Sequence, residues 1–177
     1  MREIYELSEP DRVSFGTVGE VGERVFLLQA RQGQQVVTLK LEKTQVSTLC
    51  HVLGRLLRGL DGPGELPPGG TDLEPFVLPD LVVRALQLGY DGVRDRVVLL
   101  CADTDTGEEP YDVAEESEDS EGSVVRLAMS REQAMALAIR GTELVESGRP
   151  SCPRCGYPLD PRGHVCPKLN GNAPPRI

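Results

Sequence analysis

The segment RVFLLQARQGQQVVTLKL, residues 24–41, contains two stretches of strand length with a short polar connection between them. Residues 24–30 are mostly β-branched, aromatic or aliphatic, and residues 36–41 alternate between apolar and polar over their last positions. A connection as short as RQGQ joins antiparallel neighbours. The segment therefore predicts a hairpin, which the weaker strand patterns at residues 2–7 and 13–18 extend to an antiparallel meander.

A helix is predicted directly after this meander. From Val46 to Leu60, apolar residues recur at i, i+3, i+4 and i+7, while polar residues share the opposite side. The sequence DGPG at residues 61–64 ends this pattern, and the stretch that follows is rich in proline and glycine. That stretch is predicted to be a linker, more extended than folded.

The second half of the chain repeats the pattern of the first. Residues 24–30 match RVVLLCA, 72 positions later, and residues 39–46 match LAMSREQA, 88 positions later. The turn glycines Gly19 and Gly22 have counterparts in Gly89 and Gly92. A second helix begins with a Ser-x-x-Gln capping box at Ser130. Two matches in the same order favour a duplication, with chance similarity between such units as the alternative.

The predicted fold is therefore α+β: two strand-strand-strand-helix repeats form a pseudo-two-fold antiparallel sheet domain, and a small C-terminal zinc knuckle or ribbon follows. The duplicated domain is expected over residues 1–148 and the zinc-binding module with a flexible tail over residues 149–177. Within the first domain we place repeat one at about 2–60, a linker at 61–79 and repeat two at about 80–148, with an acidic loop at 103–122.

The acidic loop carries ten carboxylates and no basic residue between Asp103 and Glu121. Such a run is expected to be a solvated loop, because its charges repel one another. A calcium loop of the EF-hand type is not supported. In DTDTG, residues 103–107, the glycine stands at the fifth position of such a loop instead of the sixth.

The most specific chemistry lies near the end of the chain, in Cys152, Cys155, His164 and Cys166. CPRCG, residues 152–156, has the spacing of a zinc knuckle, and its glycine allows the backbone to turn back with positive φ. DPRG at residues 160–163 is typical of a type I turn, which would return His164 and Cys166 to the knuckle. Alternate residues of an extended segment face the same way, so both can ligate one ion.

These four residues predict one structural zinc ion per chain, because four protein ligands leave no open position for water or substrate. Two alternatives remain open. The segment could be an unmetallated, oxidation-prone tail, or the zinc could be catalytic if His164 does not ligate.

No catalytic set can be assembled from the other residues. Cys50 and His51 are neighbours on the predicted helix and point about 100° apart, which is poor geometry for a nucleophile and its base. Cys101 ends an apolar strand, as small core residues do. Arg24 and Arg96 occupy equivalent places in the matched strands and are candidate contacts for an anion or other ligand, although surface charge is the commoner role of such arginines.

The charge distribution limits the partners. The net charge is −9, yet residues 148–177 carry five basic residues and one acidic residue. The acidic body disfavours general binding of nucleic acid, which leaves only the basic C-terminal module for that purpose. No apolar run approaches the roughly 20 residues that cross a bilayer, and no secretory signal is visible. We expect a cytoplasmic protein with reduced cysteines, no membrane contact and an oligomeric state that the sequence does not indicate.

Several motifs together resemble one family: GTVG at residues 16–19, LLQA at 27–30, LEK at 41–43 before the helix, and the ending from Gly148 to Pro167 with its CPxCG and HxCP elements. The chain resembles an uncharacterised bacterial, chiefly actinobacterial, family of similar length. The resemblance covers nearly the whole chain, and its last motif is the most specific. It implies a cytoplasmic protein with a C-terminal zinc element, and it carries over no activity and no active site.

The leading functional hypothesis is a non-catalytic, zinc-containing scaffold or adaptor that presents its zinc module to an unidentified protein partner. One alternative is an enzyme or small-ligand-binding protein that uses a groove between the two repeats. A second alternative is an RNA- or ribosome-associated protein that acts through the basic zinc module.

Overall fold

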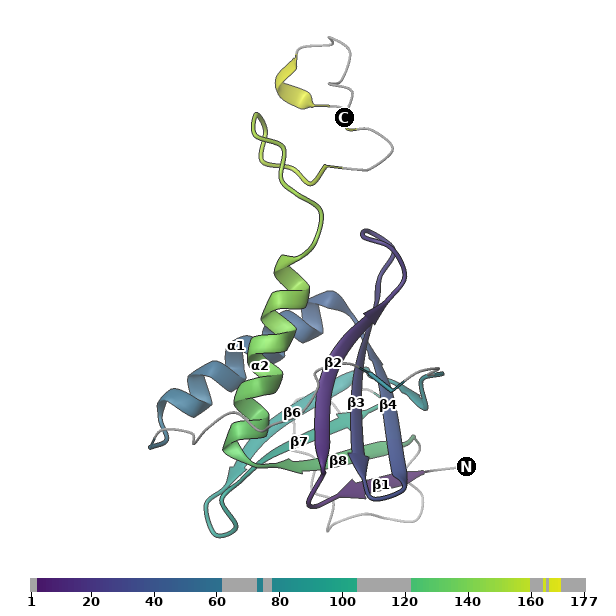
Figure 1. Ribbon diagram of the computed structural model, residues 1–177, viewed down its shortest axis with the longest axis vertical. Helices are drawn as coiled ribbons and strands as arrows, with labels where there is room; N and C mark the ends of the chain where they lie inside the picture. Colours follow the sequence, from purple (N-terminus) through teal and green to yellow (C-terminus); the bar gives the residue numbers. More distant parts are fainter. Residues whose placement is uncertain are drawn as a thin grey trace.

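The computed structural model describes residues 3–61, 73–74, 78–104, 122–159, 164 and 166–169. It is an α+β structure with two four-stranded sheets and two long helices (Figure 1). One sheet contains, in spatial order, β2 (Arg12–Val18), β3 (Val25–Gln32), β4 (Gln35–Leu41) and β5 (Leu81–Val82). The other contains β1 (Ile4–Leu7), β8 (Val124–Met129), β7 (Arg96–Ala102) and β6 (Ala85–Asp91). The helices are α1 (Lys43–Arg58) and α2 (Arg131–Glu146), with a short 3-10 helix at Pro167–Leu169.

Each sheet is an antiparallel meander of three strands to which the other half of the chain adds a fourth. β5 precedes the second meander in the sequence but pairs with β4 of the first, and β1 precedes the first meander but pairs with β8 of the second. Both of these pairs are parallel. The predicted units of three strands and a helix are therefore confirmed. They form two separate sheets, and the added pairs β4–β5 and β1–β8 are parallel where an antiparallel sheet was predicted.

The strand register corrects the predicted match between the two halves by one residue. Leu28 pairs with Leu39, and Leu99 pairs with Leu127. If Leu39 is aligned with Leu127 at the predicted offset of 88, Leu28 aligns with Leu99, at an offset of 71 and not of 72. A slip of one residue exchanges the two faces of a strand, so under this alignment Arg24 and Arg96 do not match.

The change of alignment also changes which glycines of the two halves match. Gly16 lies opposite Leu27 in β3, and Gly89 lies opposite Val98 in β7. Under the same alignment these two glycines match each other, and Gly89 lies within β6 and not in a turn as predicted. Gly19 instead lies in the turn after β2, with a positive φ of 99°. In both matched segments a helix begins with a capping box whose N-cap is the fourth residue, Glu42 in one and Ser130 in the other.

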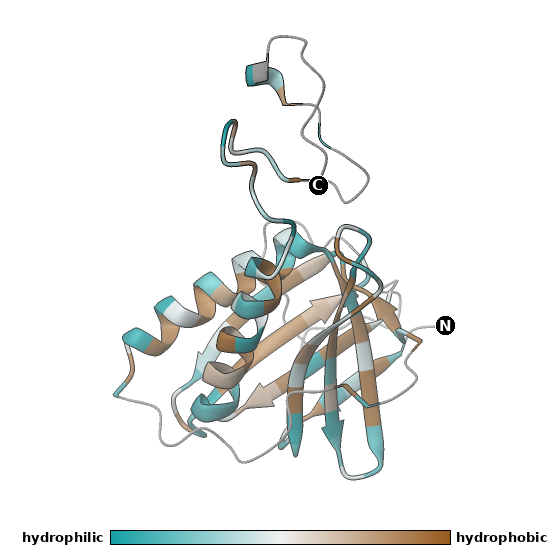
Figure 2. Cartoon of the chain, turned by 45° about the horizontal axis from the view of Figure 1, so that its top comes forward, coloured by the Kyte–Doolittle hydropathy of each residue, from teal (hydrophilic) through white to brown (hydrophobic). Residues whose placement is uncertain are grey.

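α2 packs on α1 and on strands of both sheets, and the buried residues of the helices and strands form one core. Hydrophobic residues recur along the strands of both sheets (Figure 2). The helices come close where α2 has Gly141, since a Cβ there would lie 2.3 Å from the Cys50 sulfur and 2.8 Å from the Phe15 ring. The fully buried leucines of this core each contribute about 1.5–3 kcal/mol of transfer free energy. They are Leu7, Leu28, Leu39, Leu53, Leu99, Leu127 and Leu137.

Residues 73–74 of the predicted linker pack against the meander β2–β4, whereas Leu78 is 80% exposed. The Glu74 N–H donates to Gln29 Oε1 at 2.7 Å, and the Glu74 carboxylate lies 3.0 Å from Arg31. Leu73 covers Gly16, where a Cβ would lie 2.3 Å from its side chain. Residues 62–72 and 75–77 of the linker, and residues 105–121 of the acidic loop, lie outside the described residues. Neither described α-helix is long and apolar enough to cross a membrane.

Candidate metal centre

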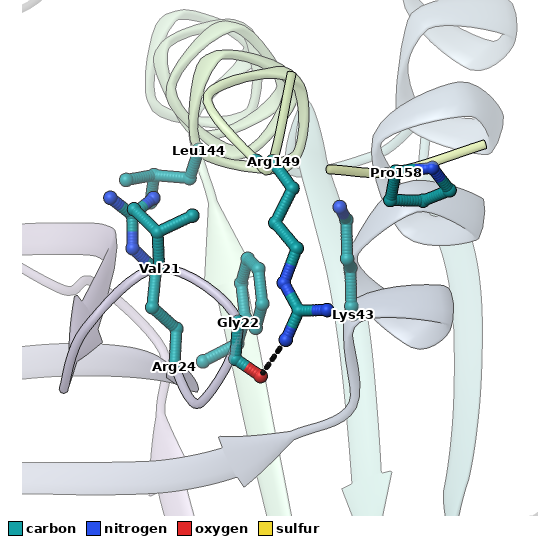
Figure 3. Close-up of a pocket in the computed structure, with 9 residues that line it drawn as sticks. Val21, Gly22, Arg24, Lys43, Leu144, Arg149 and Pro158 are labelled. Carbon is teal, nitrogen blue, oxygen red and sulfur yellow. Dashed lines mark hydrogen bonds between the residues drawn. The ribbon is translucent and has the colours of Figure 1, made fainter. Parts of the chain in front are cut away.

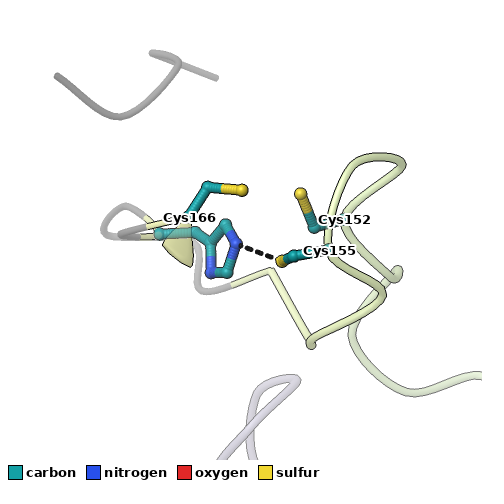
Figure 4. Close-up of side chains that lie close together, drawn as sticks. Cys152, Cys155 and Cys166 are labelled. Atoms are coloured by element: carbon teal, nitrogen blue, oxygen red, sulfur yellow. Dashed lines mark hydrogen bonds between the residues drawn. The ribbon is translucent and has the colours of Figure 1, made fainter. Parts of the chain in front are cut away.

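The structure brings the four predicted ligands together beyond the end of α2, apart from the two sheets (Figures 1 and 4). The sulfur atoms of Cys152, Cys155 and Cys166 and one ring nitrogen of His164 all lie within 4.8 Å of one another. Cys152, Cys166 and His164 are buried, and Cys155 is partly exposed. Three thiols and an imidazole therefore converge on one point.

The knuckle is a short hairpin held by its own backbone. The Gly156 N–H donates to the Cys152 carbonyl at 2.9 Å, and the Cys152 N–H donates to the Tyr157 carbonyl at 2.8 Å. The Leu159 N–H closes the base of the hairpin on the Pro150 carbonyl at 2.8 Å. Gly156 has a φ of 77°, a conformation that residues with a Cβ rarely adopt. The predicted role of this glycine is confirmed, and the turn aims Cys152 and Cys155 at the same point.

The electrostatics of the two knuckle thiols differ. Hydrogen bonds from the backbone N–H groups of Cys155 and Arg154 lower the pKa of the Cys152 thiol to about 6. Burial raises the pKa of the Cys155 thiol above its ordinary value. The Cys155 sulfur lies 3.1 Å from Nε2 of His164. Metal ligands must be deprotonated. The Cys152 thiol therefore loses its proton readily, whereas the Cys155 thiol would lose its proton only when a metal ion binds.

The cluster fits a tetrahedral metal ion. Ligand sulfurs bound at about 2.3 Å from a tetrahedral centre lie about 3.8 Å from each other, within the observed spread of 4.8 Å. His164 lies with the cysteines and points its Nε2 at the Cys155 sulfur, so the geometry does not favour the alternative in which His164 leaves the ligand set. The predicted turn at residues 160–163 lies outside the described residues.

The other cysteines are core residues. Cys50 lies against Gly141, and burial raises the pKa of its thiol to about 11. Cys101 is fully buried in β7, and burial raises its pKa to about 12. His51, the neighbour of Cys50, is exposed. Both thiols are protonated at neutral pH, which agrees with the structural role predicted for them.

Arg24 and Arg96 do not come together. Arg24 lies at the end of α2, where its Nη1 donates to Ser147 Oγ at 3.0 Å. Arg96 lies in a different pocket, beside Arg94 and Arg126. Two basic residues that the sequence did not single out, Lys43 and Arg149, lie in the pocket of Arg24. They come from segments far apart in the chain, so no local motif could have found them.

A model of one family, described as protein of unknown function (DUF3090), matches residues 5–166. The matched range includes both helices, all of both sheets except Ile4, and all four residues of the cluster. No curated protein and no solved structure matches the chain.

Proposed function

We propose that the chain, which belongs to the DUF3090 family of proteins of unknown function, is a non-catalytic scaffold or adaptor that carries one structural zinc ion. The observation that carries the proposal is the convergence of three sulfurs and one imidazole nitrogen within 4.8 Å. This ligand set suits zinc, which binds thiolate and imidazole in tetrahedral structural sites. Four protein ligands complete that geometry, so the ion has no position for a substrate.

The zinc would hold together a module that has little else to stabilise it. Its described part is one short hairpin and a single turn of 3-10 helix, in which the residues described as buried are Cys152, His164 and Cys166. In such modules metal binding supplies most of the free energy of folding. The ion would thereby present the exposed Tyr157 and Arg154 at the tip of the hairpin, where Tyr157 is 61% exposed.

The partner would be a protein that recognises this tip, in a cytoplasm that keeps the thiols reduced. Aromatic and arginine side chains are the residues that most often anchor protein interfaces. Arg154 and Lys168 are both exposed on the module, which also supports the alternative of an RNA contact. The two alternatives differ in their salt dependence, since RNA binding weakens steeply as salt rises.

The first test is metal content. Elemental analysis of the full-length protein should find about one zinc per chain, and Cys155→Ser should lower this value severely. Cys50→Ala, which removes a cysteine outside the cluster, is the matched control and should retain the ion. Full retention in Cys155→Ser would remove Cys155 from the ligand set.

The second test is co-purification from native cells with full-length protein and with the double variant Cys152→Ser/Cys155→Ser. The adaptor proposal expects a protein partner that the double variant loses. A partner that both forms retain equally would contradict it. If nuclease treatment or high salt releases the captured material, the RNA alternative replaces it.

A further inference from the structure

A second site lies where the end of α2 meets the loop between β2 and β3 and the start of α1 (Figure 3). It is a pocket of about 410 Å³, within the range of about 300–1,000 Å³ typical of small-molecule sites. Basic side chains on its wall are Arg24, Lys43 and Arg149, and apolar ones include Val21, Phe26 and Leu144. The pocket therefore offers positive charge beside a hydrophobic surface.

The charge of this pocket is unusual for the molecule. The chain has a net charge of −9, yet three cations from three separate segments line the pocket, and none of the described residues that line it is acidic. Guanidinium and ammonium groups on one wall can each bind an anionic oxygen. The arrangement favours a ligand with more than one negative charge.

Contacts with the backbone position the cations before any ligand arrives. Arg149 donates through Nη2 to the Gly22 carbonyl at 3.3 Å, and Arg24 donates through Nη1 to the Ser147 carbonyl at 3.3 Å. The Lys43 ammonium lies over Gly148, where a Cβ would be only 2.9 Å from Nζ. Side chains that are already ordered lose less entropy on binding.

A simpler role explains only part of this arrangement. The last turn of α2 has no basic residue of its own, so Arg24 also compensates the negative end of that helix. This role does not explain Arg149, which binds the loop carbonyl of Gly22, nor the apolar wall formed by Phe26 and Leu144.

We propose that this pocket binds a small organic phosphate. The phosphate dianion would lie between Arg24, Lys43 and Arg149, since guanidinium and ammonium groups form strong charge-assisted bonds to phosphate oxygens. The organic part would cover Val21, Phe26 and Leu144. Pro158 of the metal module also lines the pocket, so the ligand would contact both the body and the module. The site is independent of the adaptor function proposed above.

Isothermal titration calorimetry on the full-length protein tests the site with three probes: phenyl phosphate, inorganic phosphate and benzoate. Phenyl phosphate should bind most tightly, because inorganic phosphate lacks the apolar part and benzoate carries a single charge. Lys43→Met should raise the Kd for phenyl phosphate about tenfold, the usual effect of losing a charged hydrogen bond. Arg96→Gln is the matched control, because Arg96 lies in another pocket, and its Kd should stay within about twofold of the wild type.

A second variant keeps every charge in place. Gly148→Ala puts a methyl group 2.9 Å from the Lys43 ammonium and should weaken the binding of phenyl phosphate, because the methyl group displaces Lys43 and takes up space in the pocket lining. Lys43 is exposed, so its substitution leaves the fold intact, and the melting temperature checks this for both variants. No binding of phenyl phosphate at millimolar concentration would overturn the proposal. Equal weakening by Lys43→Met and Arg96→Gln, or benzoate binding as tight as phenyl phosphate, would also overturn it.

Discussion

Gln45 and Gln133 make the same pair of hydrogen bonds at the starts of α1 and α2. Each accepts the N–H of the residue that caps its helix, at 2.8 Å from Glu42 and at 3.0 Å from Ser130. Each then donates through Nε2 to a backbone carbonyl, Val83 at 3.1 Å for Gln45 and Pro10 at 2.6 Å for Gln133. Val83 follows β5 and Pro10 follows β1, so each glutamine joins its helix to the strand that the other half of the chain adds to that sheet.

This relationship predicts that the two glutamines stabilise the attachment of β5 and β1 to a similar extent. Gln45→Leu and Gln133→Leu each remove a helix cap and leave a carbonyl without its donor. Each should lower the free energy of unfolding by about 1–2 kcal/mol. Urea denaturation measures this, with Gln34→Leu in the exposed turn after β3 as control. Stabilities equal to that of the control would show that the glutamines do not tie these strands.

Gly141 and Gly54 form a matched pair for the helix packing. A Cβ at Gly141 would lie 2.3 Å from the Cys50 sulfur, whereas one at Gly54 would meet only the end of Arg58 at 3.9 Å. Gly141→Ala should therefore destabilise the protein by about 1–3 kcal/mol through overpacking. Gly54→Ala should be neutral or stabilise it by up to about 1 kcal/mol, because alanine favours a helix. Thermal unfolding measures both effects. If both substitutions changed the melting temperature in the same direction, this account of the helix packing would be contradicted.

Stability should fall at alkaline pH because of buried thiols. The pKa of Cys101 is raised from 9.0 to about 12 by burial, so the unfolded chain loses this proton first as the pH rises. The folded state then binds more protons than the unfolded state. Cys101 therefore adds to stability below about pH 9, and this contribution declines by up to about 1.4 kcal/mol per pH unit above it. The measurement is the slope of the unfolding free energy against pH between pH 8 and 10. This slope should be shallower for Cys101→Ala than for the wild type. Identical slopes would exclude this thiol as a cause.

Removal of the metal should release the module and leave the body folded. The amides of Cys152, Gly156 and Leu159 bond only within the knuckle hairpin, which has no large apolar core to hold it. After treatment with a zinc chelator, hydrogen exchange at these three amides should become much faster. The amides of Leu99 and Leu127, in the paired strands β7 and β8, should exchange as before. Unchanged exchange at the hairpin would mean that no metal holds it.

Local spacing determined much of this protein. The apolar period placed both helices, the capping box at Ser130 placed the start of the second, and the Cys and His spacing placed the candidate metal centre. All of these depend on residues at most fifteen positions apart, where the chain itself limits which side chains can meet. The sequence alone therefore sufficed for the cluster of candidate metal ligands and for the meander-helix units.

Only the tertiary structure decided the strand register, the exchange of β1 and β5 between sheets, and the meeting of Arg24, Lys43 and Arg149. In LLQA and LLCA two consecutive apolar residues fit either face of a strand, so letter matching could not reveal the shift from 72 to 71. β1 meets β8 about 120 residues away, and the three cations come from opposite halves of the chain. Such contacts follow from how the layers bury their apolar faces together, which no short window of sequence contains.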